Sequence, residues 1–279
     1  MKIFKKIYLT LIIIITIVAF GVLLYPSISN YINNKYAVDT ISQYKKKIET
    51  APKKEVDESL EKANMYNRCI AQGFRPKGLF KDGYMFGYVD IPKIKVNLPI
   101  FEGTSKEILR KGVGVMDGTS IPVGGNNTHT VLAAHTGLTT QKMFTDIDKL
   151  KKGDLFFIHA FNINLAYEVC DINLVKPSNT SIVKIYPNKD CATLLTCYPY
   201  GINTERLLVT GKRVPYNQNK EESSNSNNNI TSSLDSNLKI SYKLKLLLII
   251  IILMVLFIFW IIFKNHRKNS KNKKLSSKK

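Results

Sequence analysis

The sequence predicts a mainly β domain, either a closed barrel or a sandwich, with a helical region before it and a transmembrane helix on each side. About eight short apolar or alternating segments recur within residues 83–216, separated by turns rich in Gly, Asn, Asp and Pro. Short strands at this spacing are typical of closed barrels and sandwiches. Uncharged apolar runs occupy residues 7–24 and 246–263, outside that domain.

Each apolar run is long enough to cross a bilayer. At about 1.5 Å rise per residue, each spans roughly 27 Å as a helix, close to the hydrocarbon thickness of a membrane. A cleaved signal peptide is the alternative for the first run, but no small-x-small cleavage site follows it. A buried core helix is the alternative for the second, but that run has no polar face. We therefore expect transmembrane helices at residues 7–25 and 244–263.

The distribution of positive charge sets the expected topology. A formal net charge of +20 could indicate a nucleic-acid binder, yet much of the excess lies in residues 1–6 and in the lysine-rich tail 264–279. Lys and Arg flanking a transmembrane helix mark the cytoplasmic side. Both termini are therefore expected in the cytoplasm, the domain between them outside the cell, and nucleic acid is not an expected partner.

Two further segments differ in composition from the β domain. Residues 26–82 have helical spacing of apolar side chains, interrupted at Ala51-Pro52, and are expected to form an extracellular helical or lid-like region. Residues 217–243 are rich in Asn and Ser and nearly lack large apolar side chains. Such a segment cannot bury enough apolar surface to order itself, so a disordered tether is expected.

The expected strands are residues 86–91, 94–100, 129–134, 154–159, 163–175, 181–185, 192–197 and 206–214. The segment FTDIDKLKKGD, residues 144–154, is expected to interrupt them with a helical turn.

The chain has four cysteines: Cys69, Cys170, Cys191 and Cys197. An even number outside the cell allows disulfides, and Cys170 could pair with Cys191, but the sequence does not decide connectivity. No CxxC spacing occurs and the four histidines are scattered, so no metal site is expected. Cys197 closes a predicted strand, where a thiol is either inert packing, half of a disulfide, or a nucleophile.

The neighbours of Cys197 favour a nucleophile. A thiol attacks as the thiolate, which requires a nearby base or positive charge. Arg206 begins the next predicted strand, and two antiparallel strands joined by a short loop would place it near Cys197. His135 also stands where a predicted strand gives way to a loop, although a structural role remains open for any single histidine.

From about residue 83 to 215 the chain resembles the sortases, specifically the pilin-assembling class C. TLLTC at 193–197 matches the segment that carries the sortase cysteine, and PYGINTERLLVTGKR at 199–213 matches its class C continuation. THTVLAAHTGL at 128–138 resembles the strand that carries the catalytic histidine, and LPIFEGTS at 98–105 also resembles class C.

The resemblance implies a closed eight-stranded sortase barrel with Cys197 as nucleophile, His135 as proton-transferring partner and Arg206 holding the sorting peptide or the oxyanion. The implied substrate is a surface protein with an LPxTG-like signal, cleaved between Thr and Gly through a thioacyl intermediate. A pilin lysine amine would then resolve the intermediate. No cofactor is implied.

One departure and three alternatives accompany this interpretation. Class C sortases usually carry an Asp-Pro-aromatic lid that covers the cysteine, and residues 60–88 lack that tripeptide. Phe74 or Phe80 could substitute for its aromatic residue. The alternatives are a sortase that attaches proteins to peptidoglycan, a non-catalytic surface-binding domain, and a plain cysteine protease.

Overall fold

The computed structural model describes residues 2–138, 140–179, 184–217 and 221. The chain divides into two compact units, Met1–Glu222 and Ser223–Lys279. The predicted second transmembrane helix, the basic tail and most of the predicted tether belong to the second unit. These predictions therefore fall outside the described residues.

Two helices precede the barrel: α1 (Lys2–Thr50) and α2 (Lys53–Ala71). The break between them falls at Ala51-Pro52, where the sequence predicts it, because a proline favours the start of a helix over its interior. Helix α1 continues through Pro26 without interruption. The membrane-type segment and the helical region after it therefore form one continuous element. Among the described residues, α1 is the one helix long and apolar enough to cross a membrane, and the apolar window of this helix is exposed.

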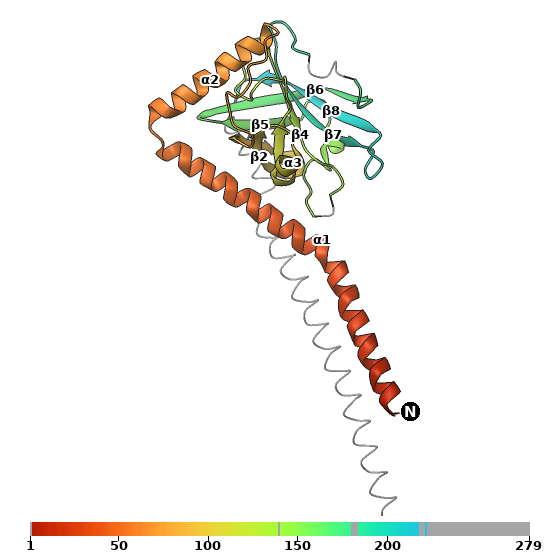
Figure 1. Cartoon of the computed structure of the whole chain (residues 1–279). Helices are drawn as coiled ribbons and strands as arrows, with labels where there is room; N and C mark the ends of the chain where they lie inside the picture. The colour runs from red at the N-terminus through yellow and green to blue at the C-terminus, as the bar shows by residue number, and fades with distance from the viewer. Residues whose placement is uncertain (1, 139, 180–183, 218–220, 222–279) are drawn as a thin grey trace, which may run out of the picture. The chain divides into compact units, whose positions relative to one another are not determined.

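Eight strands form a closed barrel in the order β1-β2-β3-β4-β7-β8-β6-β5 (Figure 1). Their bounds are β1 Met85–Ile91, β2 Val96–Glu102, β3 Val113–Val115, β4 Thr128–Ala133, β5 Leu155–Ala160, β6 Ile163–Val175, β7 Asp190–Tyr198 and β8 Glu205–Val214. The pairs β2–β3 and β4–β7 are parallel, and the other six neighbouring pairs are antiparallel. Closure removes the exposed sheet edges that an open sheet would present.

The predicted fold class, a mainly β closed barrel, is confirmed, with differences in detail. Strand β3 and helix α3 (Lys106–Lys111) were not predicted from the sequence. Strand β3 is only three residues long and has Gly114 at its centre, so it carries little strand propensity. Of the expected strand 181–185, residues 181–183 lie outside the described residues, and residues 184–185 are not in a strand. The expected helical turn is the short 3₁₀ helix η2 (Ile147–Lys149).

The strands sort their side chains into an inner and an outer set. On β7, Ala192 and Leu194 belong to the main core inside the barrel. The alternate residue Leu195 belongs to a second apolar cluster with Val131, Ala133 and Leu208. Successive side chains of a strand point to opposite faces of a sheet. The second cluster therefore lies on the outer face of β4, β7 and β8.

Helix α1 is attached to the barrel by buried side chains and three hydrogen bonds. Ala37 and Ile41 are buried, and the Tyr44 hydroxyl donates to the Phe86 carbonyl at 2.6 Å. The same hydroxyl accepts from the Phe161 amide at 2.7 Å. Nearer the N-terminus, Asn33 Nδ2 donates to the Thr140 carbonyl at 2.9 Å. The helix therefore contacts both the β1–β5 side of the barrel and the loop that follows β4.

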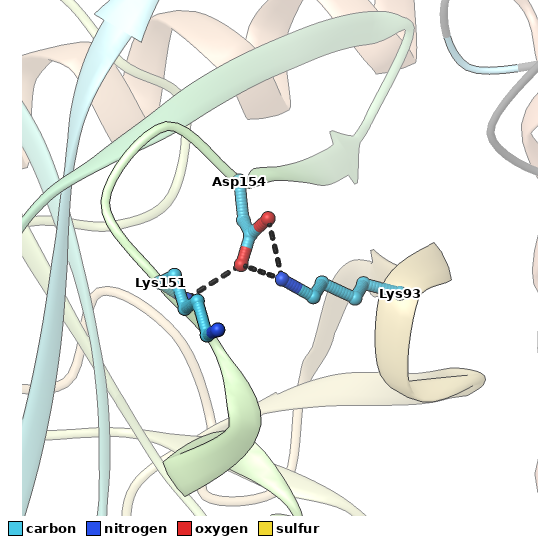
Figure 2. Close-up of polar contacts among 3 residues, drawn as sticks. All are labelled: Lys93, Lys151 and Asp154. Atoms are coloured by element: carbon cyan, nitrogen blue, oxygen red, sulfur yellow. Dashed lines mark hydrogen bonds and ion pairs between the residues drawn. The ribbon is translucent and has the colours of Figure 1, made fainter.

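An ion pair at the surface joins the segment between β1 and β2 to the turn before β5 (Figure 2). Lys93, in the short 3₁₀ helix η1 (Pro92–Ile94), contacts both carboxylate oxygens of Asp154 at 2.8 and 2.7 Å. The Asp154 carboxylate also accepts from the amide of Lys151, so it holds its own turn and η1 together. Because Lys93 is partly exposed, the free energy contributed by the ion pair is about 0–1 kcal/mol.

Candidate active site

Cys197 and Arg206 lie directly opposite each other in the barrel wall. They are partners in the antiparallel pairing of β7 with β8, next to the loop that joins the two strands. Directly opposed residues on neighbouring strands have Cβ atoms about 4.5–5.5 Å apart and share one face of the sheet. Both side chains are half-buried, so they are ordered by the sheet and still open to a substrate.

His135 lies just beyond the end of β4, which flanks β7 on the side opposite β8. Strands β4 and β7 are parallel, with Ala133 opposite Leu195. Beyond the last strand pair, the Ala134 amide donates to the Leu195 carbonyl at 3.1 Å. Continued by two residues past the end of β4, the register of Ala133 with Leu195 would bring His135 opposite Cys197. The row expected from this register consists of the half-buried side chains of His135, just beyond β4, Cys197 on β7 and Arg206 on β8.

The outer apolar cluster adjoins this row. Residues two apart on a strand share a face, so Ala133, Leu195 and Leu208 lie immediately beside His135, Cys197 and Arg206, respectively. Leu109, Met116 and Val175 pack around the cluster and are only partly buried. The three polar side chains therefore border a buried apolar cluster, and the partly exposed residues around that cluster are Leu109, Met116 and Val175.

Burial and charge set the protonation of His135. Burial lowers the pKa of its imidazole, and the positive charge of Arg110 in α3 lowers it further. The neutral imidazole is therefore favoured at neutral pH, so it can accept a proton from the thiol. Among the three side chains of the row, Arg206 supplies the permanent positive charge. Its Nη1 donates to the carbonyls of Asn203 at 3.2 Å and Glu205 at 2.9 Å, which hold the guanidinium against its own loop.

The disulfide left open by the sequence does not form. All four cysteines are free. Cys170 is on β6 and Cys191 on β7, and β8 lies between those strands. Strands two apart are separated by roughly 9–10 Å, beyond the Cα separation that a disulfide can bridge. Burial raises the pKa of the Cys191 thiol, so this cysteine is a poor nucleophile.

No cluster of three or more His, Cys, Asp or Glu side chains suited to a metal ion occurs in the part of the chain that the structure describes.

The two aromatic residues considered for a lid have other surroundings. Phe80 packs against Tyr84 and Phe86, with ring centroids 4.9 and 5.1 Å apart, at the edge of the barrel core. Phe74 is exposed. Neither observation places a ring over Cys197. The neighbouring Arg75 guanidinium instead lies beside Gly118 in the β3–β4 loop, where a methyl group on the glycine would approach it to 2.8 Å.

Sequence reasoning did not identify Thr196, Arg110 or Tyr200 as parts of this site. Thr196 is within the TLLTC segment, and its hydroxyl donates to the Ala134 carbonyl at 2.7 Å. The influence of Arg110 on His135 has no local sequence signal, because α3 and the end of β4 meet only in the folded chain. Tyr200 could have been noticed as an aromatic residue three positions after the thiol.

Comparison with known proteins identifies the family that this domain resembles. The sortase domain family matches residues 89–214. Sortase D of Bacillus subtilis is 33% identical over 135 residues, which cover 47% of this chain and 65% of that protein. The chain spans 65%, 51% and 60% of the lengths of the first three curated relatives.

Solved structures match more completely. The structure of Clostridium perfringens sortase C with the C-terminal cell wall sorting motif is 52% identical, with a TM-score of 0.62. The match covers 64% of this chain and 100% of that one. Streptococcus pneumoniae sortase C is 41% identical, with a TM-score of 0.59, over 64% of this chain and 97% of that one.

The chain belongs to the sortase family, whose members are cysteine transpeptidases. Its structural neighbours are class C sortases, and the identities of 52% and 41% place the chain in that class.

Proposed function

We propose that this protein is a membrane-anchored cysteine transpeptidase that cleaves LPxTG-like sorting signals and joins the released Thr carbonyl to a pilin lysine. The observation that carries the proposal is the pairing of Cys197 with Arg206 across β7 and β8, with His135 just beyond the end of β4, the other neighbour of β7. Acyl transfer by a thiol requires a base, a nucleophile and a positive group near the developing oxyanion, and the row offers one of each.

In the first half-reaction the neutral His135 imidazole takes the proton of Cys197. The thiolate attacks the Thr carbonyl carbon of the sorting signal, and a carbon–sulfur bond forms. The negative charge that develops on the carbonyl oxygen is stabilised by Arg206. The bond between the Thr carbonyl carbon and the Gly nitrogen breaks, and His135 returns its proton to the leaving amine. A thioester with Cys197 remains.

In the second half-reaction an amine attacks the thioester. A lysine amine of a pilin subunit adds to the Thr carbonyl carbon, and His135 accepts the proton that the amine loses. The carbon–sulfur bond breaks, an isopeptide bond is left, and Cys197 is free for another cycle. Atoms, protons and electron pairs balance without a cofactor.

The apolar cluster beside the row supports a sorting-signal substrate. Val131, Ala133, Leu195 and Leu208 are buried, and the partly exposed Leu109, Met116 and Val175 around them offer apolar contacts for the Leu-Pro part of an extended LPxTG peptide, with its Thr carbonyl at Cys197. In the class C neighbour from Clostridium perfringens, the structure includes a C-terminal cell wall sorting motif.

A pilin acceptor is supported by the class of the neighbours. The structure of the Streptococcus pneumoniae neighbour is described as informative on pilin substrate specificity, and another neighbour is sortase C1 of a group B streptococcal pilus island. Attachment of surface proteins to peptidoglycan is the second candidate, because sortase A proteins are also among the relatives.

The proposed location is the outer surface of the cell membrane, with α1 as anchor. The apolar part of α1 is exposed and near the N-terminus, and Lys2, Lys5 and Lys6 precede it. These lysines favour a cytoplasmic N-terminus. Anchoring confines the enzyme to the surface on which its substrates are held by their own apolar tails, which raises their effective concentration. A second anchor at residues 244–263 remains a prediction from the sequence.

The decisive experiment uses the full chain in lipid nanodiscs, with an LPxTG-type peptide and two competing amines: a pilin domain and a peptidoglycan stem peptide. Intact-mass and peptide mass spectrometry should detect a thioester on Cys197 and a Thr–lysine isopeptide product. Cys197→Ala should abolish both products. Cys170→Ala is the matched control, because Cys170 is also half-buried but lies outside the row.

The alternatives make different predictions in the same assay. A peptidoglycan-anchoring sortase would transfer the peptide to the stem-peptide amine in preference to the pilin lysine. A protease would release hydrolysed, Thr-terminated peptide even with abundant amine. A non-catalytic binding domain would form no thioester, and that result would refute the proposed function.

A further inference from the structure

Tyr200 links the loop that follows Cys197 to the loop that carries His135. A methyl group placed on Gly137 would meet three ring atoms of Tyr200, Cε2, Cδ2 and Cζ, at 3.3, 3.5 and 3.6 Å. The ring therefore packs directly against the main chain of Gly137. Gly137 is two residues after His135, and Tyr200 is three residues after Cys197.

The loop after His135 is folded so that it presents Gly137 to the ring. The His135 carbonyl accepts from the Phe144 amide at 3.1 Å, and the Gly137 amide donates to Thr145 Oγ1 at 3.1 Å. Gly137 has a φ of +73°, which a residue with a side chain rarely adopts. These contacts fix the loop from one side, and the Tyr200 ring contacts it from another.

The turn that carries Tyr200 is held by its own hydrogen bonds. The Pro199 carbonyl accepts from the amides of Ile202 and Asn203 at 3.1 and 2.9 Å. The Asn203 carbonyl in turn accepts from Arg206 Nη1. The position of Tyr200 is therefore coupled to the end of β7 and the start of β8. Tyr200 is 61% exposed, so packing in the core does not account for its position.

We propose that Tyr200 is a positioning residue for the reaction: its ring holds the loop after β4 so that the His135 imidazole stays beside the Cys197 sulfur. Proton transfer requires donor and acceptor about 2.6–3.2 Å apart, and a misplacement of about 1 Å can cost roughly 100-fold in rate. The contact with Gly137 uses the ring and needs no hydroxyl. This inference rests on the proposed roles of Cys197 and His135.

The test compares Tyr200→Ala, Tyr200→Phe and the control Ile202→Ala in the full chain in nanodiscs. Ile202 is in the same turn and 67% exposed, so it matches Tyr200 in place and exposure. For transfer of an LPxTG-type peptide, Tyr200→Ala should lower kcat about 10- to 100-fold with little change in KM. Tyr200→Phe should keep kcat within about 2-fold of the original, because it retains the ring. Ile202→Ala should leave both constants unchanged.

A second readout needs no substrate. The rate at which iodoacetamide alkylates Cys197 is measured against pH, because this rate follows the thiolate population. If His135 sets the ionisation of the thiol, His135→Ala shifts the profile, and Tyr200→Ala should shift it in the same direction. The double variant should then behave like His135→Ala alone, because a positioning residue has no effect once its target is removed.

A Tyr200→Ala variant that raises only KM, with kcat and the alkylation profile unchanged, would show that the ring binds substrate, and the inference would be wrong. If Tyr200→Ala does not fold, as judged by circular dichroism, Tyr200→Leu removes the ring but keeps an apolar side chain and should also lower kcat. Failure of the proposed function is distinguishable, because the unsubstituted protein would then form no thioester, and its alkylation profile would not respond to His135→Ala.

Discussion

The Thr196 hydroxyl donates a hydrogen bond of 2.7 Å to the Ala134 carbonyl. Both residues are buried, and each directly precedes a proposed catalytic residue, Cys197 or His135. The bond therefore joins the ends of β4 and β7 at the point where the imidazole and the thiol must meet. It gives a physical reason for a threonine, rather than another β-branched residue, before the cysteine.

Replacing Thr196 with valine should lower both stability and transfer rate. Valine keeps the shape but removes the donor to a buried carbonyl, which costs about 1–3 kcal/mol of unfolding free energy. Thermal unfolding and peptide-transfer kinetics measure the two effects, and Thr196→Ser should retain most of both. Thr193→Val is the control, because it removes a buried hydroxyl of the same strand that bonds His129 and Thr210 instead. Equal losses of kcat in the two valine variants would contradict the expected role of Thr196.

Arg206 should tolerate neither alanine nor lysine. Removing a donor to a developing oxyanion typically costs about 100- to 1,000-fold in kcat, and a lysine keeps the charge without the planar fork of donors. Single-turnover formation of the Cys197 thioester is the appropriate measurement. Lys212→Ala, which removes an exposed cation from the same strand, should leave the rate unchanged. Full activity in Arg206→Lys would indicate that only the charge is needed.

Arg110 should shift the pH dependence of the reaction. Its positive charge disfavours the imidazolium, so Arg110→Gln should raise the pKa of His135. The limb of the kcat/KM profile that reports His135 should then move to higher pH. Because Arg110 is exposed, added salt should reduce the difference between the two proteins. Lys106→Gln, on the same helix, should leave the limb in place, and an equal shift there would indicate a non-specific effect of net charge.

Glu102 should make stability depend on pH near neutrality. Burial, together with Asp117 and Asp82, raises the pKa of its carboxyl to about 7. The folded protein then binds this proton more tightly than the unfolded chain does, so stability falls as pH rises from about 4.5 through 7. Glu102→Gln should remove that fall and stabilise the protein at pH 8 by about 1–2 kcal/mol, after allowance for solvent screening. Thermal unfolding from pH 5 to pH 8 tests this, and parallel curves for the two proteins would contradict it.

Local patterns predicted most of the barrel. Alternating apolar residues predict seven of the eight strands. Strand β3 was not predicted, because Gly114 interrupts a very short segment. That glycine is required by the fold, since a methyl group there would lie 2.2 Å from the Gly103 carbonyl oxygen. Helix α3 has too few residues for a helical period to be recognised.

The two halves of the site differ in how far sequence could predict them. The position of Arg206 opposite Cys197 follows from a short loop between antiparallel strands, which is a local relationship. The position of His135 depends on the parallel pairing of β4 with β7, more than sixty residues apart; its place at the end of a predicted strand made it a candidate, and the resemblance to sortases assigned it a role. The same non-local strand order places β8 between Cys170 and Cys191, which no count of cysteines could reveal.

If α1 anchors the protein as proposed, the hydrogen bond between Asn33 and Thr140 sets the distance of the loop after His135 from the membrane. Helix α1 runs unbroken from its apolar segment to Asn33, and residues 26–33 rise about 12 Å at 1.5 Å per residue. With residues 7–25 in the bilayer, the loop after His135 would lie about 12 Å from the membrane surface. A sorting signal would then need a spacer of about four extended residues to lift its scissile bond that far. Lengthening α1 by two turns after Tyr25 should move Cys197 roughly 11 Å further from the membrane and favour substrates with proportionally longer spacers.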